Sequence, residues 1–126
     1  MRIAVRVARI LLGILFVFFG SNAFLNFLPM PPMPPGSARD FLYSLVDSHY
    51  VFVVSGCQVL GGMLLLINRY IPLALTILGA VIVNILSYHI FMMPTGLPLA
   101  LVVAILWAFL FYRYRQNFTG LFVQKA

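Results

Sequence analysis

The longest uncharged stretch of the chain runs from residue 70 to 112 and reads YIPLALTILGAVIVNILSYHIFMMPTGLPLALVVAILWAFLFY. It is too long for one membrane-spanning helix, because about 20 apolar residues already cross the roughly 30 Å hydrocarbon core of a bilayer. The segment Pro94-Thr95-Gly96-Leu97-Pro98 breaks the stretch into two helices. We therefore predict spans at about 71–93 and 97–112, with a proline in each first turn, where proline is tolerated.

Two further apolar runs precede this stretch, at about 10–28 and 50–68. The first follows three arginines and has a second interpretation, a secretory signal peptide cleaved near Ser21-Asn22-Ala23. Its apolar run continues beyond that site to Leu28, which is longer than a typical signal-peptide core. We therefore predict a retained span, and four spans in all.

The loop between the first two spans, residues 29–49, is rich in proline. Its run of prolines at 29–35 forbids a helix and favours extended polyproline II. Ser37-Ala38-Arg39-Asp40 then resembles a capping box, and apolar residues follow at helical spacing. This pattern predicts a short amphipathic helix at the membrane interface, with an ordinary ordered loop as the alternative.

The basic residues orient the four predicted spans. Seven of the eight Lys and Arg fall on one side of the membrane: Arg2, Arg6, Arg9, Arg69, Arg113, Arg115 and Lys125. Arg39 is alone on the other side, and cytoplasmic loops carry such an excess. We expect an all-α bundle of four transmembrane helices forming one domain, 1–126, in the bacterial inner (plasma) membrane with both termini cytoplasmic.

Composition excludes several other classes of protein. The chain is 63% hydrophobic and 8% charged, whereas soluble domains carry about 25% charged residues. Its basic residues stand singly at the ends of apolar runs, without the basic patch that nucleic-acid binding requires. Cys57 is the only cysteine, so the chain cannot form an internal disulfide or a CxxC redox site.

Polar side chains inside the spans are the candidates for function, because lipid makes isolated polar groups costly. A rise of 1.5 Å per residue gives the depth of each polar side chain in the membrane. Several of them, from three different helices, fall at a similar depth in the predicted outer half of the bundle. These candidate ligand-binding residues are Asn22, Asn26, Ser55, Gln58, Asn84, Ser87 and His89. They either hydrogen-bond across helices and stabilise the bundle, or line a pocket for a quinone, a lipid or another small amphiphile.

Other chemistry has little support in the sequence. Two histidines facing each other can ligate a haem, and His49 and His89 are the only histidines of the chain. His49 sits in or beside the loop rather than at a position facing His89, which argues against a haem site. We find no metal-ligand cluster and no nucleophile paired with a base, so we predict no catalytic residue and no metal. No cofactor is evident in the sequence, and a quinone is the one candidate.

Several motifs, taken in order, resemble the DoxX family of small bacterial membrane proteins with four helices. They are Arg9-Ile10-Leu11-Leu12-Gly13, Phe19-Gly20-Ser21-Asn22-Ala23-Phe24, Gln58-Val59-Leu60-Gly61-Gly62-Met63-Leu64-Leu65-Leu66, Asn68-Arg69-Tyr70-Ile71-Pro72-Leu73-Ala74, Asn84-Ile85-Leu86-Ser87-Tyr88-His89 and Pro94-Thr95-Gly96-Leu97-Pro98. The resemblance covers nearly the whole chain and implies a four-helix membrane bundle. Relatives include a subunit of thiosulfate:quinone oxidoreductase and members of complexes that manage oxidative or thiol stress.

The chain departs from that family at two positions. Ala23 stands where many relatives carry a basic residue, and Gln58 where many carry an acid. Neutral groups thus replace a buried ion pair, which argues against proton-coupled chemistry in this chain.

We therefore expect an accessory subunit that binds a quinone or lipid-like molecule and is not an enzyme on its own. Loop 29–49 would dock another membrane or periplasmic protein, and the chain is either a monomer or a homo-oligomer. The alternative is a ligand-free structural or assembly protein of a redox or stress-response complex. A self-contained oxidoreductase lacks a visible cofactor site, and a transporter or channel lacks intramembrane charge.

Overall fold

The computed structural model describes residues 2–28 and 32–125, and within them the regular structure is helical. The elements in chain order are α1 (Arg2–Leu25), α2 (Ser37–Asp47), α3 (Val51–Ile67), α4 (Ile71–Phe91), the 3₁₀ turn η1 (Pro94–Gly96), α5 (Leu97–Arg113) and the 3₁₀ segment η2 (Arg115–Phe122). Of the predicted polyproline segment, residues 29–31 lie outside the described part of the chain.

The long uncharged stretch divides as its prolines predict. Helix α4 ends at Phe91, a single 3₁₀ turn follows, and α5 begins at Leu97 with Pro98 in its first turn. At the other end of α4, the sharp turn from α3 uses left-handed backbone at Asn68 (φ 58°) and Tyr70 (φ 54°). Pro72 then lies in the first turn of α4, where its missing N–H leaves no helical hydrogen bond unmade.

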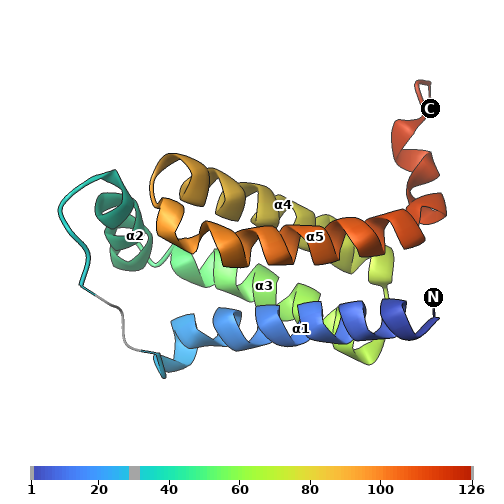
Figure 1. Ribbon diagram of the computed structural model, residues 1–126, viewed down its shortest axis with the longest axis horizontal. Helices are drawn as coiled ribbons and strands as arrows, with labels where there is room; N and C mark the ends of the chain where they lie inside the picture. The colour runs from blue at the N-terminus through green and yellow to red at the C-terminus, as the bar shows by residue number, and fades with distance from the viewer. Residues whose placement is uncertain (1, 29–31, 126) are drawn as a thin grey trace.

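The four long helices form a ring in which each packs on its neighbours (Figure 1). Helix α1 lies along α3, α3 on α4, α4 on α5, and α5 returns to α1. Helix α1 begins and α5 ends at the same end of the bundle (Figure 1). We call this the terminal end, and the opposite end the α2 end.

The predicted amphipathic helix exists as α2 (Ser37–Asp47), so the alternative of an ordinary ordered loop is wrong. It lies across the end of the bundle, at 85° to α3 (Figure 1). Its expected capping box does not form, because Gly36 is the N-cap and no side chain caps the helix. Instead Phe41 packs on the Tyr88 ring of α4 at 5.5 Å, and the Tyr88 hydroxyl donates to the Ala38 carbonyl at 3.5 Å.

Helices α1 and α3 approach backbone to backbone through glycines. A Cβ on Gly13 would lie 2.9 Å from the carbonyl oxygen of Gly62, and a Cβ on Gly62 would lie 2.8 Å from that of Gly13. No side chain fits between two helix backbones this close, and small residues permit such packing between membrane helices. Higher on the same interface, Gly20 of α1 faces Gln58 of α3.

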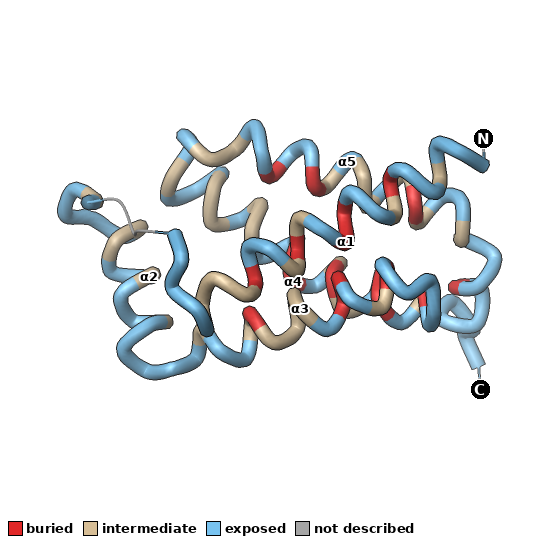
Figure 2. Tube along the Cα trace, turned by 90° about the horizontal axis from the view of Figure 1, so that it is seen from below, coloured by how far each residue is buried: buried red, intermediate tan, exposed pale blue. Residues whose placement is uncertain are grey.

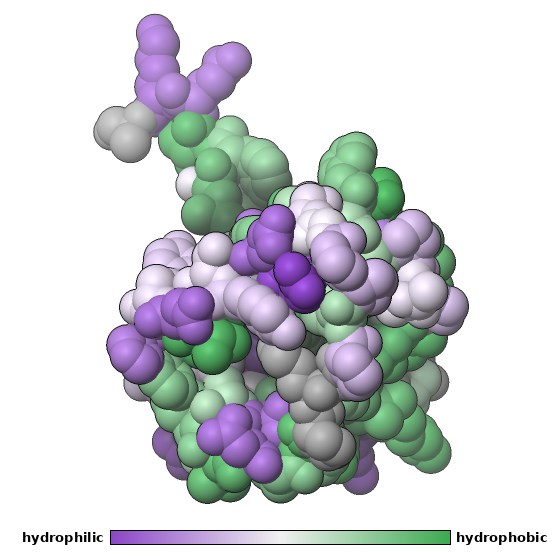
Figure 3. Space-filling model, turned by 90° about the vertical axis from the view of Figure 1, so that its left-hand side faces the viewer, coloured by the Kyte–Doolittle hydropathy of each residue, from purple (hydrophilic) through white to green (hydrophobic). Residues whose placement is uncertain are grey.

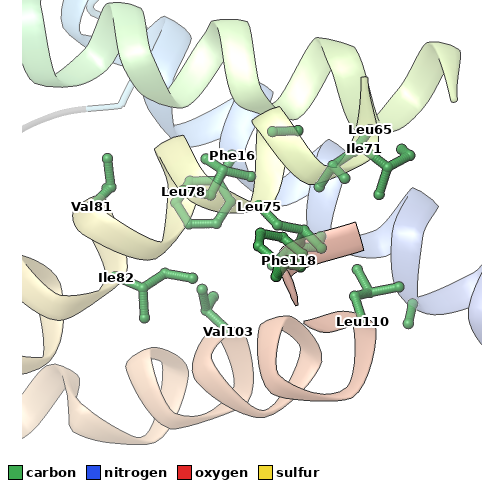
Figure 4. Packing of buried hydrophobic residues seen from close by; sticks show 13 residues of the cluster. Phe16, Leu65, Ile71, Leu75, Leu78, Val81, Ile82, Val103, Leu110 and Phe118 are labelled. Carbon is green, nitrogen blue, oxygen red and sulfur yellow. The ribbon is translucent and has the colours of Figure 1, made fainter. Parts of the chain in front are cut away.

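The core is a column of aliphatic side chains between the four helices (Figures 2 and 4). Leu12, Leu65, Leu75, Leu78 and Leu110 are fully buried in it. Phe118 of η2, which sequence patterning does not predict, turns back into this column and is 4% exposed (Figure 4). Its ring contacts Phe111 of α5 at 4.8 Å.

The outer surface of the bundle is apolar, as a bilayer requires. Large side chains such as Val53, Val83 and Ile105 are more than 60% exposed on different helices. By length and composition, α1, α4 and the segment Pro94–Arg113 can each cross a membrane, and α2 with α3 forms a fourth, bent candidate. The α2 end is more polar than the sides of the bundle, and Figure 3 shows hydrophilic and intermediate side chains on it. The chain is therefore an all-helical protein suited to a membrane.

Candidate ligand-binding site

A cavity of about 250 Å³ lies between the four helices of the ring, near the α2 end. Its walls are apolar except for two side chains, Gln58 of α3 and His89 of α4. The apolar residues around it are Leu15, Phe16, Phe19, Ile85, Gly96, Leu99, Ala100 and Val103. We call this space the inner cavity. An apolar chamber with a few convergent polar groups is the usual form of a small-molecule site.

Gln58 reaches the inner cavity because the helix facing it carries a glycine. A Cβ on Gly20 would lie 2.9 Å from the Cβ of Gln58 and 3.2 Å from its Oε1. Any larger residue at position 20 would therefore displace the amide. The Gln58 side chain is partly buried and offers both N–H donors and a carbonyl acceptor.

His89 is held in place from two sides. Its Nδ1 lies 3.0 Å from the Met93 carbonyl oxygen, and its ring meets the Tyr88 ring edge to face at 5.1 Å. Because a carbonyl oxygen only accepts, Nδ1 carries the proton in this hydrogen bond. In the neutral ring Nε2 is then an acceptor, which favours a ligand that donates an O–H or N–H.

A larger groove of about 970 Å³ lies beneath α2, between the end of α1 and the start of α3. Three of the predicted site residues line it: Asn22, Asn26 and Ser55. We call this space the α2 groove. Phe19 lines both the groove and the inner cavity, so this side chain stands at the boundary between the two spaces.

The asparagines of the groove also shape the end of α1. The Asn22 Oδ1 accepts a hydrogen bond from the Leu28 N–H at 2.8 Å. Asn26 has a left-handed backbone (φ 52°), and its N–H donates to the Asn22 carbonyl at 2.8 Å. Asparagine tolerates this conformation better than most residues. Ser55, by contrast, is 5% exposed and is the one buried polar residue of the described chain.

Asn84 and Ser87 belong to neither space. Both are exposed on α4, and each bonds a backbone carbonyl of its own helix. The Asn84 Nδ2 donates to the Ala80 oxygen and the Ser87 Oγ to the Val83 oxygen, both at 2.9 Å. The structure thus divides the seven predicted residues: Gln58 and His89 share the inner cavity, three line the α2 groove, and two face outward.

The residues of the site that the sequence did not predict are those that shape the cavity rather than offer a polar group to a ligand. Phe19, Gly20 and Gly96 determine the boundary of the inner cavity and the positions of its two polar side chains. Gly20 and Gly96 carry a signal in the sequence, since each stands in a short polar or helix-breaking motif. Phe19 carries none, because it is one of 12 phenylalanines in the chain.

The two histidines do not meet. His89 lines the inner cavity, while His49 lines the α2 groove, with its ring stacked on Phe52 at 5.8 Å. Within residues 2–28 and 32–125, no three His, Cys, Asp or Glu side chains gather closely enough to hold a metal ion.

Comparisons with models of protein families, with curated proteins and with solved structures find no match to this chain.

Proposed function

We propose that the chain is a DoxX-like accessory protein of the bacterial inner membrane that binds a quinone or a similar amphiphile. In this proposal all four long helices span the bilayer. At 17 residues α3 reaches about 26 Å, close to the roughly 30 Å of the hydrocarbon core. Its position between α1 and α4 supports a span parallel to theirs.

Charge supports a cytoplasmic terminal end. Six arginines lie at the start of α1, in the turn from α3 to α4, at the end of α5 and at the start of η2, and Lys125 follows near the C-terminus. Arg39 of α2 is the eighth basic residue and sits at the other end. By the positive-inside rule, this distribution supports a cytoplasmic terminal end and a periplasmic α2 end.

The observation that carries the ligand proposal is the pairing of Gln58 and His89 in an otherwise apolar cavity. A saturated acyl chain would leave both polar groups without partners, which disfavours it. A quinol or quinone ring is apolar on its faces and carries hydroxyl or carbonyl groups on its edge. Its hydroxyl can donate to His89 Nε2, while the Gln58 amide can serve either redox form.

The α2 groove supports an amphiphile with a tail. It borders the inner cavity at Phe19 and is mostly lined by apolar side chains. A ring bound by Gln58 and His89 could extend its chain past Phe19 into this groove. Helix α2 and the loop before it remain the surface we propose for a membrane or periplasmic partner, such as a subunit of a quinone-linked oxidoreductase.

Native mass spectrometry of protein released from its own membrane tests the proposal. The sharpest comparison is Gln58→Leu against Asn84→Leu, because both replace an amide by leucine but only Gln58 lines the cavity. We expect a stoichiometric quinone or quinone-like molecule on wild type and Asn84→Leu, and its loss from Gln58→Leu. Equal retention by both variants would exclude the inner cavity as the site.

A ligand-free assembly protein is the second candidate, and one observation favours it. The side chains of Asn22, Asn84 and Ser87 each make a hydrogen bond to the backbone of their own helix or of the residues just after it, so each has a partner without a ligand. On this alternative the wild-type mass would show only loosely held bulk lipid. Gln58→Leu would then alter thermal stability in detergent rather than ligand retention.

A further inference from the structure

The terminal end of the bundle carries a separate polar cavity of about 260 Å³. It lies where the start of α1 meets the end of α5 and the turn after α3. Its polar lining consists of Arg2, Arg6, Arg9, Asn68, Arg113 and Tyr114. We call this space the arginine pocket. It lies at the opposite end of the bundle from α2 (Figure 1).

No carboxylate side chain balances these four arginines. The chain has two acidic residues in all, Asp40 and Asp47, and both belong to α2. Four guanidinium groups around one small cavity repel each other, and water screens this repulsion in part because Arg2, Arg6 and Arg113 are exposed. A bound anion would remove it and would accept charge-assisted hydrogen bonds.

One of the four arginines is already fixed in position. The Arg9 Nη1 donates to the carbonyl of Leu65, and also to that of Leu66 at 3.3 Å, both in the last turn of α3. A guanidinium has five N–H donors, so Arg9 keeps further donors for a ligand. A side chain that is held before binding loses less conformational entropy when the ligand arrives.

We propose that the arginine pocket binds the phosphate of an anionic phospholipid from the leaflet at the terminal end. Exposed apolar side chains flank it, including Ile3 and Val7 of α1 and Ile67 of α3, each more than half exposed. These side chains can pack on acyl chains, whereas a free phosphate ion would gain nothing from them. Basic pockets between helices on the cytoplasmic side suit anionic headgroups. The pocket is independent of the inner cavity and of the quinone proposal.

Wild-type protein in detergent gives the first test. Phosphatidylglycerol and phosphatidylcholine are added at equal concentration, and lipid adducts are measured by native mass spectrometry. We expect phosphatidylglycerol to be retained at least about tenfold more strongly, and a large excess of inorganic phosphate not to displace it. Equal retention of the two lipids would overturn the proposal, and displacement by phosphate would identify a free-anion site instead.

Two variants with the same net charge locate the binding. Arg6→Gln with Arg113→Gln removes two pocket arginines, while Arg69→Gln with Lys125→Gln removes two exposed cations that do not line it. We expect the first to lose about tenfold in phosphatidylglycerol affinity and the second to change less than about twofold. An equal loss would mean diffuse attraction and would overturn the proposal.

Folding of both double variants is checked by gel filtration and thermal melting. If the pocket variant does not fold, Arg6→Gln alone is compared with Arg69→Gln alone, since both side chains are exposed. We again expect the pocket variant, Arg6→Gln, to lose more phosphatidylglycerol affinity than Arg69→Gln. Equal affinities of the two single variants would contradict the proposal.

Discussion

The imidazole of His89 rests on Gly96, the residue that precedes α5. A Cβ on Gly96 would overlap the ring, at 2.6 Å from Nδ1 and 3.1 Å from Nε2. The helix break after α4 and the side chain at the end of α4 therefore form one unit. Gly96 has an ordinary backbone (φ −90°), so the contact with His89, and not backbone strain, requires glycine here.

Gly96→Ala should displace His89 and weaken its hydrogen bond to Met93. We expect a loss of about 1–3 kcal/mol, typical of overpacking, and reduced retention of the co-purified amphiphile. Thermal melting and native mass spectrometry measure the two effects. Gly120→Ala is the control, because a Cβ there meets nothing within 4 Å. An unchanged melting temperature and ligand occupancy in Gly96→Ala would show that the His89 position does not matter.

Gly62→Ala should separate α1 from α3. The added Cβ would lie 2.8 Å from the Gly13 oxygen and 3.0 Å from the Val17 backbone nitrogen, and neither backbone atom can move alone. We expect destabilisation by about 1–3 kcal/mol, measured by thermal or SDS unfolding in detergent. Gly56→Ala, in the same helix but with open space around it, should be neutral or stabilising by up to about 1 kcal/mol. Equal effects at the two positions would contradict the close packing.

Phe19→Ala should open the boundary between the inner cavity and the α2 groove. We expect the bound amphiphile to dissociate about tenfold faster, equivalent to about 1.4 kcal/mol off the barrier, because no ring then separates the two spaces. The loss of ligand during a timed detergent wash gives the rate. Phe91→Ala removes an equal ring that is 81% exposed and should leave the rate unchanged. A wash rate in Phe19→Ala equal to that of wild type would remove Phe19 from the ligand's route.

Arg9→Gln should loosen the end of α3. The variant loses the hydrogen bonds from Arg9 to the carbonyls of Leu65 and Leu66. Hydrogen bonds to charged groups contribute about 1.5–3 kcal/mol, so we expect destabilisation in that range. Faster amide hydrogen exchange in the α3–α4 turn would report the change locally. Lys125→Gln removes one exposed charge elsewhere and should alter neither measurement. If amide exchange in the α3–α4 turn rose as much in Lys125→Gln, the loss of one positive charge, and not the loss of the Arg9 hydrogen bonds, would explain the effect.

Helix positions and the break between α4 and α5 are predictable from residues near each other in sequence. Apolar length, Pro94 and Pro98 predict two helices, and the structure has them as Ile71–Phe91 and Leu97–Arg113. The start of α1 is less well predicted: it begins at Arg2 rather than Ile10. Arginine is a good helix former, so the helix continues beyond the apolar run that marks a span.

The rotation of each helix about its axis is not predictable in this way. A helix that is apolar all round carries no stripe that identifies its buried face, and α4 is such a helix. The predicted depth in the membrane was therefore the reason to place Asn84 and Ser87 in one site with Gln58 and His89. In the structure Asn84 and Ser87 face outward and donate to carbonyls four residues back, so each finds a hydrogen-bond partner within its own helix.

By itself, then, the sequence determined an all-helical protein suited to a membrane, the helix break at 94–98 and the amphipathic helix Ser37–Asp47. These follow from apolar length, proline chemistry and local periodicity. The tertiary structure alone decided that Gln58 and His89 share a cavity, and that Arg9 and Arg113 share another. Those pairs depend on which faces meet when helices pack through glycines, a choice made by contacts between residues far apart in the chain.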